Sequence, residues 1–334
     1  MSKILSEKNI LLFLSFFLIT FVFINFTHNS SEKFKPFSEG KYYKLNNSEF
    51  KNNINEKLTS NENYDLVINK DCEITGNMHD RHKVRWVKSY FLKNFFVISN
   101  KFNSNFPYYA NILLHSFLIF LTLIFLDQSF NLKKKHIIFY LLYISFIFQN
   151  YLGEYSYSIF EMFFASVALF ASKRKNLILF LLITLLAVLN RESGFIILFT
   201  WLIYNKNFKE FLVFFLIIMT IFLLINFKTI NCMLNPTFFI PLIPQEGQVN
   251  FNDFGSINIF SLTKLVFINY LIPFGIIFYN YYKLNIKNNY FILIVVIYLF
   301  TFLVATPAHH LAVRLIILPL IIFSFYSSER IKIN

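Results

Sequence analysis

The chain has 334 residues, of which 56% are hydrophobic, 20% are aromatic and only 15% are charged. A soluble domain carries about 25% charged residues, so this composition argues against an ordinary cytosolic protein. The seven glycines are spaced so that they form no phosphate-binding loop and no dinucleotide fingerprint. A nucleotide-hydrolysing pump built on those motifs is therefore excluded.

Apolar runs near the length that crosses a bilayer recur along almost the whole chain. We therefore predict an all-α, polytopic integral membrane protein with about ten transmembrane helices. The expected spans cover residues 9–27, 107–126, 136–150, 156–172, 177–190, 194–205, 211–227, 259–282, 290–305 and 311–327.

The positions of Lys and Arg test this map independently, because these residues are enriched in cytoplasmic loops. Lys3 and Lys8 precede the first span, and every second connection thereafter is basic. All of them fall on one side of the membrane if the N- and C-termini are both cytoplasmic. The net charge of +13 then reflects topology, and we expect no nucleic-acid partner. The basic connections are Lys133–Lys135, Lys173–Lys175, Lys206 with Lys209, Lys283 with Lys287, and Arg330 with Lys332.

The predicted organisation has three parts. Residues 1–27 form an N-terminal membrane anchor helix, which we expect to stay uncleaved because no small-residue cleavage site follows it. Residues 28–106 form a long external loop, and residues 107–334 form a multi-span transmembrane domain. Within the loop, Val84–Phe102 has apolar residues at helical spacing, which predicts an amphipathic helix on the membrane surface. We expect a protein of the plasma (inner) membrane, with the lipid bilayer as a partner.

The charges on the predicted external face are few. Arg191 and Glu192 lie in a short external turn, where an arginine departs from the positive-inside pattern. Ionisable groups in membranes are functional candidates by default, so both residues are candidates for substrate binding. The alternative is a local Arg191–Glu192 ion pair, with the arginine reaching the lipid headgroups.

Two more pairs of ionisable residues share helical faces in the predicted spans. Arg314 follows His310 by four residues, so one face of the last span carries both. Glu154 and Glu161 are seven residues apart and also share a face. These side chains are candidates for substrate binding, or alternatively Glu161 is an ion-pair partner that holds the helix of Arg314.

The external loop gathers acids and bases just ahead of the amphipathic helix. Asp71 and Glu73 supply oxygen ligands of the kind that Mg²⁺ or Mn²⁺ takes, which makes them candidate metal ligands. Asp80, or either of the other two acids, is a candidate general base. Arg81 and Arg85 suit an anionic lipid or a sugar phosphate, or alternatively anchor the loop to the membrane surface.

These features resemble the bacterial GT-C superfamily of multi-pass glycosyltransferases. The long loop after the first span matches in position, and Asp71-Cys72-Glu73 looks like a variant of the family's Asp-x-Asp type motif. Phe106-Pro107-Tyr108-Tyr109 resembles the family's proline-containing entry to the second helix, and Leu189–Gly194 is similar to an Arg-Glu-Thr/Ser turn of related membrane proteins. Arg314, followed by Leu318-Pro319, resembles their C-terminal arginine-containing helix.

The resemblance implies a membrane glycosyltransferase that moves a sugar from a polyprenyl-phosphate donor to an acceptor on the external face. Arg191 and Arg314 would bind the phosphate of this lipid-linked sugar donor. One acid among Asp71, Glu73 and Asp80 would deprotonate the acceptor hydroxyl, with a Mg²⁺ or Mn²⁺ ion assisting the leaving group.

Besides a purely structural membrane subunit, two other functions stay open on the sequence alone. One is a polymerase of lipid-linked polysaccharide repeat units, which would use similar external arginines. The other is a transporter or flippase for a lipid or solute, in which Glu161, His310 and Arg314 line the path. The sequence also leaves the oligomeric state open.

Overall fold

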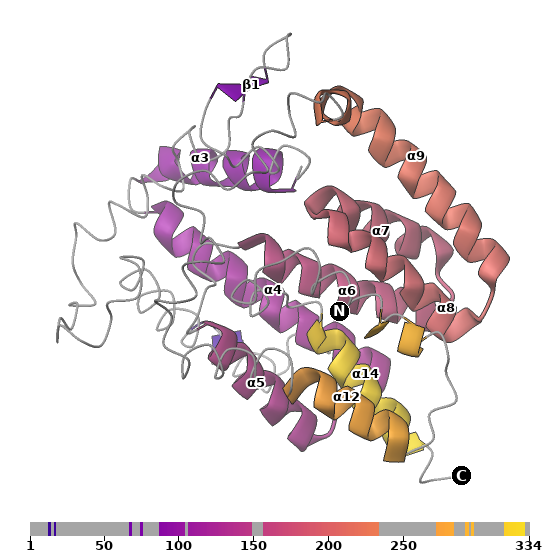
Figure 1. The fold of residues 1–334 in the computed structure, drawn as a ribbon. Coiled ribbons are helices and arrows are strands. Elements are labelled where there is room, and N and C mark those ends of the chain that lie inside the picture. The colour runs from indigo at the N-terminus through magenta and orange to yellow at the C-terminus, as the bar shows by residue number, and fades with distance from the viewer. Residues whose placement is uncertain are drawn as a thin grey trace, which may run out of the picture.

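The computed structural model describes residues 87–103, 106–148, 156–233, 272–283 and 317–330, with short pieces at 13–14, 17, 67–68, 74–75, 291–293 and 295–296. These residues are almost entirely helical, which confirms the predicted all-α class (Figure 1). The exception in the described chain is a two-residue antiparallel pair, in which β1 (Val67–Ile68) lies beside β2 (Ile74–Thr75).

The helices follow the apolar runs of the sequence. A π-helical turn, η3 (Val87–Leu92), leads into α3 (Lys93–Phe102), so the predicted amphipathic segment is helical. The first long helices are α4 (Phe106–Phe130), α5 (Lys134–Phe148), α6 (Ser156–Arg174) and α7 (Leu177–Asn190). They are followed by the 3-10 helix η4 (Glu192–Leu198), α8 (Phe199–Asn205), α9 (Phe208–Met233), α12 (Ile272–Lys283) and α14 (Ile317–Arg330).

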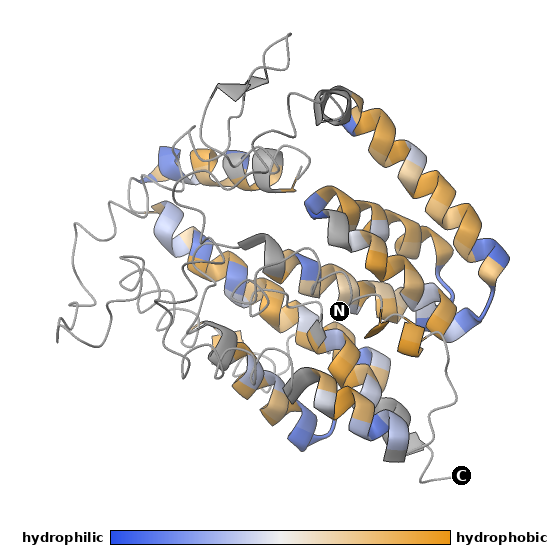
Figure 2. Ribbon diagram, in the orientation of Figure 1, coloured by the Kyte–Doolittle hydropathy of each residue, from blue (hydrophilic) through white to orange (hydrophobic). Residues whose placement is uncertain are grey.

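Two of these helices are long and apolar enough to cross a membrane. They are Phe106–Phe130 and Phe208–Phe227, and both pass by length and composition alone. Leu177–Asn190 and Gly194–Asn205 are shorter apolar helices, and Figure 2 shows α7 and α9 as mostly hydrophobic along their lengths. The described helices thus include two candidate spans, while the complete set of about ten remains a prediction.

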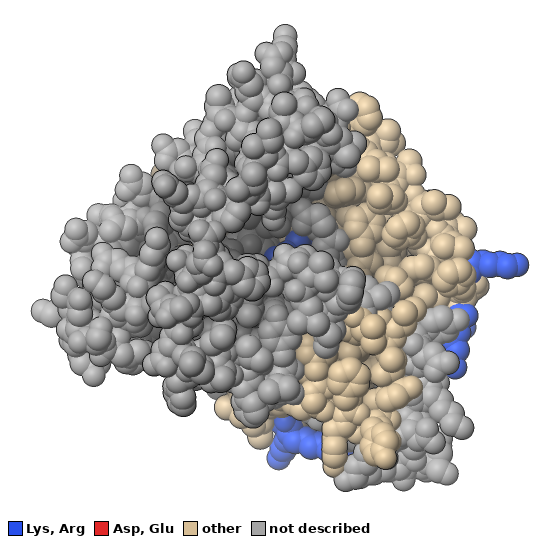
Figure 3. Space-filling view, viewed as in Figure 1, with Lys and Arg blue, Asp and Glu red and all other residues tan. Residues whose placement is uncertain are grey.

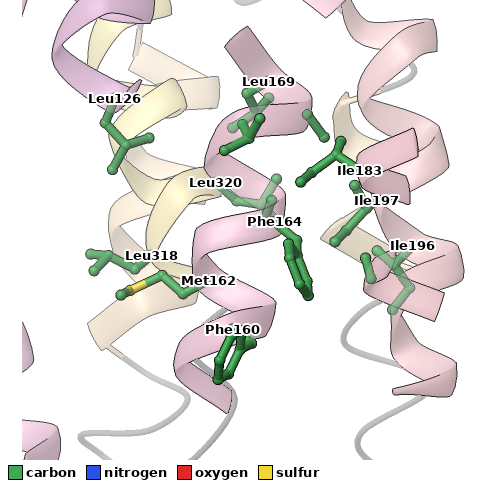
Figure 4. Packing of buried hydrophobic residues seen from close by; sticks show 14 of the residues in the cluster. Leu126, Phe160, Met162, Phe164, Leu169, Ile183, Ile196, Ile197, Leu318 and Leu320 are labelled. Carbon is green, nitrogen blue, oxygen red and sulfur yellow. The ribbon is translucent and has the colours of Figure 1, made fainter. Parts of the chain in front are cut away.

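Helix α6 lies at the centre of the core. It packs against α4 on one side and α7 on the other, and it also contacts η4, α8 and α14. Figure 4 shows Phe160, Met162 and Phe164 of α6 among side chains from these neighbours. Leu126 comes from α4 and Ile183 from α7, and all five side chains are buried. The position of any group on α6 is therefore set by packing on several sides.

Three of the basic connections lie at one end of this bundle. Lys173, at the end of α6, donates a hydrogen bond to the carbonyl of Ser129 at the end of α4. Asn205, at the end of α8, donates to the carbonyl of Ser172 over 3.3 Å. The C-terminal ends of α4, α6 and α8 therefore meet, and with them the connections that carry Lys133–Lys135, Lys173–Lys175 and Lys206 with Lys209. Figure 3 shows basic side chains projecting from the margin of the described surface, and other basic atoms recessed near its centre.

Candidate functional site

The site begins at a one-residue break after α7. Asn190 ends the helix, and Arg191 has an extended backbone with φ −164° and ψ 145°. Its N–H donates to the carbonyl of Ala187 over 2.9 Å, and its own carbonyl accepts from the N–H of Gly194 over 2.8 Å. Asn, Ser and Gly are weak helix formers that favour helix ends, and they surround the break. Helix α7 therefore ends where the predicted turn Asn190–Ser193 begins, but only Arg191 is non-helical, because η4 starts at Glu192.

Gly194 allows η4 to pack tightly against the last turns of α7. A Cβ atom at this position would lie 2.4 Å from the carbonyl carbon of Ala187 and 2.5 Å from the backbone nitrogen of Val188. These are rigid backbone atoms, so any side chain would push η4 away from α7. The close packing that Gly194 allows therefore helps to fix the position of Arg191 between α7 and η4.

Arg191 points into the bundle and meets a carboxylate of α6. Its Nη1 lies 3.5 Å from Oε2 of Glu161, and the two side chains are 7% and 0% exposed. The two-residue connection of Lys175 and Asn176 makes α6 and α7 antiparallel neighbours, so residues early in α6 and late in α7 lie at the same level. Burying either charge alone is costly, and pairing offsets much of that cost.

More polar side chains are buried in the same half of the bundle. Asn111 and His115 lie one turn apart in the first half of α4, and Asn190 ends α7; all three are at most 1% exposed. The Oδ1 atom of Asn111 has no hydrogen-bond partner within the part of the chain that the structure describes. Glu161 also lies in the first half of its helix, so these groups sit away from the end that carries the basic connections.

Sequence reasoning did not single out Asn111 and His115. Both are polar residues four apart inside an otherwise apolar run, which places them on one helical face. Buried polar side chains in native proteins are usually hydrogen-bonded, so two such residues on a buried face mark a polar region. That spacing was the signal by which they could have been found.

The structure shows one ion pair among the candidate site residues. Arg191 is paired with Glu161, a pair that the sequence had not suggested. The suggested pairs, Arg314 with this acid and Glu192 with this arginine, stay predictions. Glu192 is the first residue of η4, and its side chain is outside the description. The other candidates also lie outside the described residues: Asp71, Glu73, Asp80, Arg81, Arg85, Glu154, His310 and Arg314.

The predicted metal site therefore stays a prediction. Among the residues that the structure describes, no group of three or more His, Cys, Asp or Glu side chains is arranged to hold a metal ion. Asp71 and Glu73, the candidate ligands for Mg²⁺ or Mn²⁺, are not among those residues. Comparisons of the whole chain with protein-family models, with curated proteins and with solved structures found no match.

Proposed function

We propose that the chain is a multi-pass protein of the plasma membrane, with about ten spans and both termini cytoplasmic. Two observations support this topology. Two helices have the length and composition of membrane spans, and three connections rich in lysine come together at one end of the bundle. Lysine-rich ends on one side are the pattern that a cytoplasmic face produces. Arg191 and Glu161 then lie toward the external face.

In this membrane the protein transfers a sugar from a polyprenyl-phosphate donor to an acceptor on the external face. The observation that carries the proposal is Arg191, an arginine buried at a helix break in the half of the bundle opposite the basic connections. A lipid-linked sugar phosphate presents an anionic group near the membrane boundary, and a guanidinium binds phosphate through parallel N–H donors. Charge that develops on the leaving phosphate is stabilised most by a cation held in place beforehand.

Glu161 holds this cation in position. A guanidinium on a flexible side chain loses conformational entropy when it is fixed, and the ion pair with α6 fixes it before the donor arrives. The carboxylate also neutralises one positive charge. Arg314, predicted on the same side, restores a net positive charge toward the phosphate. The two arginines and Glu161 together would then match the single negative charge of a phosphodiester.

The reaction displaces polyprenyl phosphate from the sugar. The acceptor oxygen forms a bond to the anomeric carbon while the bond from that carbon to the phosphate oxygen breaks. A carboxylate of the loop, among Asp71, Glu73 and Asp80, takes the proton of the acceptor hydroxyl. A Mg²⁺ or Mn²⁺ ion held by Asp71 and Glu73 would supply further charge for the leaving phosphate.

The test is sugar transfer in membranes that contain the full chain. Vesicles receive a radiolabelled hexose linked to polyprenyl phosphate, and the label that leaves the lipid is counted. We expect Arg191→Ala to abolish transfer while insertion into the membrane stays normal. The matched control is Arg174→Ala, at the opposite end of the bundle, where the guanidinium lies over the ring of Phe170. Equal transfer by wild type and Arg191→Ala would overturn the proposal.

A transporter or flippase is the second candidate, and one observation favours it. Glu161 is fully buried inside the bundle, and buried ionisable residues in membrane helices commonly line solute or proton paths. The two functions differ in what happens to the labelled donor. A transporter moves the labelled lipid across the vesicle membrane and leaves the bond between sugar and phosphate intact, whereas a transferase breaks it.

A further inference from the structure

Helix α3 and the turn before it have two apolar faces. One face is buried: Leu92 and Phe96 are each 1% exposed, and Ser99 is 4% exposed. The hydroxyl of Ser99 donates to the carbonyl of Phe96 over 2.7 Å, so this polar group is satisfied within its own helix. This face packs against α4. The sequence alone predicted a single apolar face for this segment, seated on the membrane.

The second apolar face is exposed. Phe91, Ile98 and Phe102 are 52%, 54% and 77% exposed, and Phe95 between them is partly buried. Successive members are four, three and four residues apart, so they form one stripe along the helix. The ring of Phe91 stacks on that of Phe95 at 6.3 Å between centroids and also meets the ring of Phe160 of α6 at 6.0 Å, so the Phe91 end of the stripe contacts the bundle as well. Large apolar side chains gathered on one face mark an interaction surface more often than scattered ones do.

This stripe continues onto α4, a candidate membrane span. The ring of Phe102 lies 6.1 Å from the ring of Phe106, which begins α4. From there Phe106, Tyr109, Leu113 and Phe117 are 41–49% exposed and follow one another at helical spacing. At 1.5 Å per residue the helix is about 37 Å long, enough to cross the hydrocarbon core. The exposed face of such a helix contacts acyl chains.

We propose that these exposed residues of α3 and α4 form one lipid-facing surface, with the stripe of α3 seated where acyl chains meet headgroups. Asn94 and Lys101 flank the stripe, each about one turn from Ile98, and Asn100 lies on the far side; all three are exposed. A helix with an apolar stripe and a basic polar side rests at that boundary, with its apolar side chains about 5–10 Å deep. Lys101 then favours anionic headgroups. The inference rests on the membrane location proposed above and not on the proposed chemistry.

The test places a tryptophan on each side of α3 in the full chain. Ile98→Trp reports the stripe, Asn100→Trp is the matched control on the polar side, and Leu113→Trp reports the exposed face of α4. Each variant is reconstituted in phosphatidylcholine–phosphatidylglycerol vesicles with brominated acyl chains, and the wild-type signal of Trp86 and Trp201 is subtracted. We expect brominated lipid to quench the reporters at 98 and 113 several times more than the reporter at 100. Aqueous iodide should show the reverse order.

The possible outcomes distinguish a failure of the lipid contact of α3 from a failure of the proposed membrane location. Quenching at 113 without quenching at 98 would overturn the lipid contact of α3 and leave the span of α4 intact. Absence of quenching at both positions would overturn both. Shielding of position 98 from lipid and from iodide, together with cross-linking that rises with protein concentration, would assign the stripe to a second copy of the chain and overturn the inference. Phe102→Trp, at the most exposed position of the stripe, repeats the test if Ile98→Trp folds poorly.

Discussion

Oε2 of Glu161 lies 3.5 Å from Nη1 of Arg191, and this ion pair joins α6 to the break between α7 and η4. Both side chains are almost completely removed from solvent. In such surroundings an opposite charge nearby offsets part of the cost of burying each group. The pair thus couples the position of the proposed phosphate-binding arginine to the most enclosed helix of the core.

The first prediction concerns the stability of this pair. Glu161→Gln leaves a buried arginine beside a neutral amide, so we expect unfolding to become easier by about 3–5 kcal/mol. The double variant Glu161→Gln/Arg191→Gln should lose less than the single variant, because it leaves no uncompensated charge. The measurement is unfolding of the purified full chain by sodium dodecyl sulfate in mixed micelles, followed by circular dichroism.

Glu210→Gln is the matched control for the Glu161 variants. Glu210 accepts a hydrogen bond from Nε1 of Trp201 over 2.9 Å, and a glutamine keeps an oxygen that can accept it. We expect a change within about 1 kcal/mol. A Glu161→Gln variant as stable as the control would contradict the view that the buried pair is tightly coupled.

The second prediction uses two glycines in contrasting surroundings. Gly194→Ala places a methyl group against the backbone of Ala187 and Val188, and we expect a loss of about 1–3 kcal/mol from overpacking. Gly275→Ala meets no atom within 4 Å in the first turns of α12, and should raise stability by about 0.5–1 kcal/mol. The same unfolding experiment compares the two. Equal effects of the two substitutions would show that η4 does not pack against α7 as described.

The third prediction tests the contact between α12 and α14. The amide of Asn280 donates to the hydroxyl of Ser324 over 3.2 Å, and both side chains are buried. A buried hydrogen bond contributes about 0.5–1.5 kcal/mol net, so Asn280→Leu and Ser324→Ala should each cost a small amount. Their double-mutant cycle should show a coupling of that size. Strict additivity would mean that the two helices do not meet through these residues.

The extent of the helices was predictable because apolar periodicity and weak helix formers are local properties. The expected runs 156–172 and 177–190 agree closely with α6 and α7. The break at Arg191 was predictable as well, since Asn190, Ser193 and Gly194 favour a helix end. The short helix α8 could not be separated from η4, because the apolar pattern runs through both without interruption.

The partner of Glu161 was not predictable in the same way. An acid in an apolar run needs a buried partner, but which cation meets it depends on how helices far apart in sequence pack. The sequence suggested Arg314 for this role; the structure shows Arg191 beside Glu161, and Arg314 lies outside the described residues. The spacing of Asn111 and His115 marks a polar face of α4, but which groups that face meets also depends on how the helices pack.

The fourth prediction concerns the carboxylate that acts as the general base of the proposed transferase. Of the three candidate bases, Asp80 is the one whose loss we expect to abolish sugar transfer in the vesicle assay, because the acceptor hydroxyl would then keep its proton. Asp127→Ala is the matched acid control, since Asp127 Oδ1 only accepts from the N–H of Leu132 at the end of α4. Loss of transfer in the Asp127 variant, with Asp80→Ala still active, would contradict this assignment. It would place the reaction at the end of the bundle that carries the basic connections.

The most direct measurement of the central claim is binding of a short prenyl phosphate to the purified full chain. Farnesyl phosphate and farnesol differ only in the phosphate, so the ratio of their affinities in detergent micelles reports recognition of that group. We predict a clear preference for farnesyl phosphate in the wild type, a reduced preference in Arg191→Lys because a single ammonium replaces the guanidinium, and none in Arg191→Ala. An unchanged preference in Arg191→Ala would contradict the role of this arginine in binding the donor phosphate.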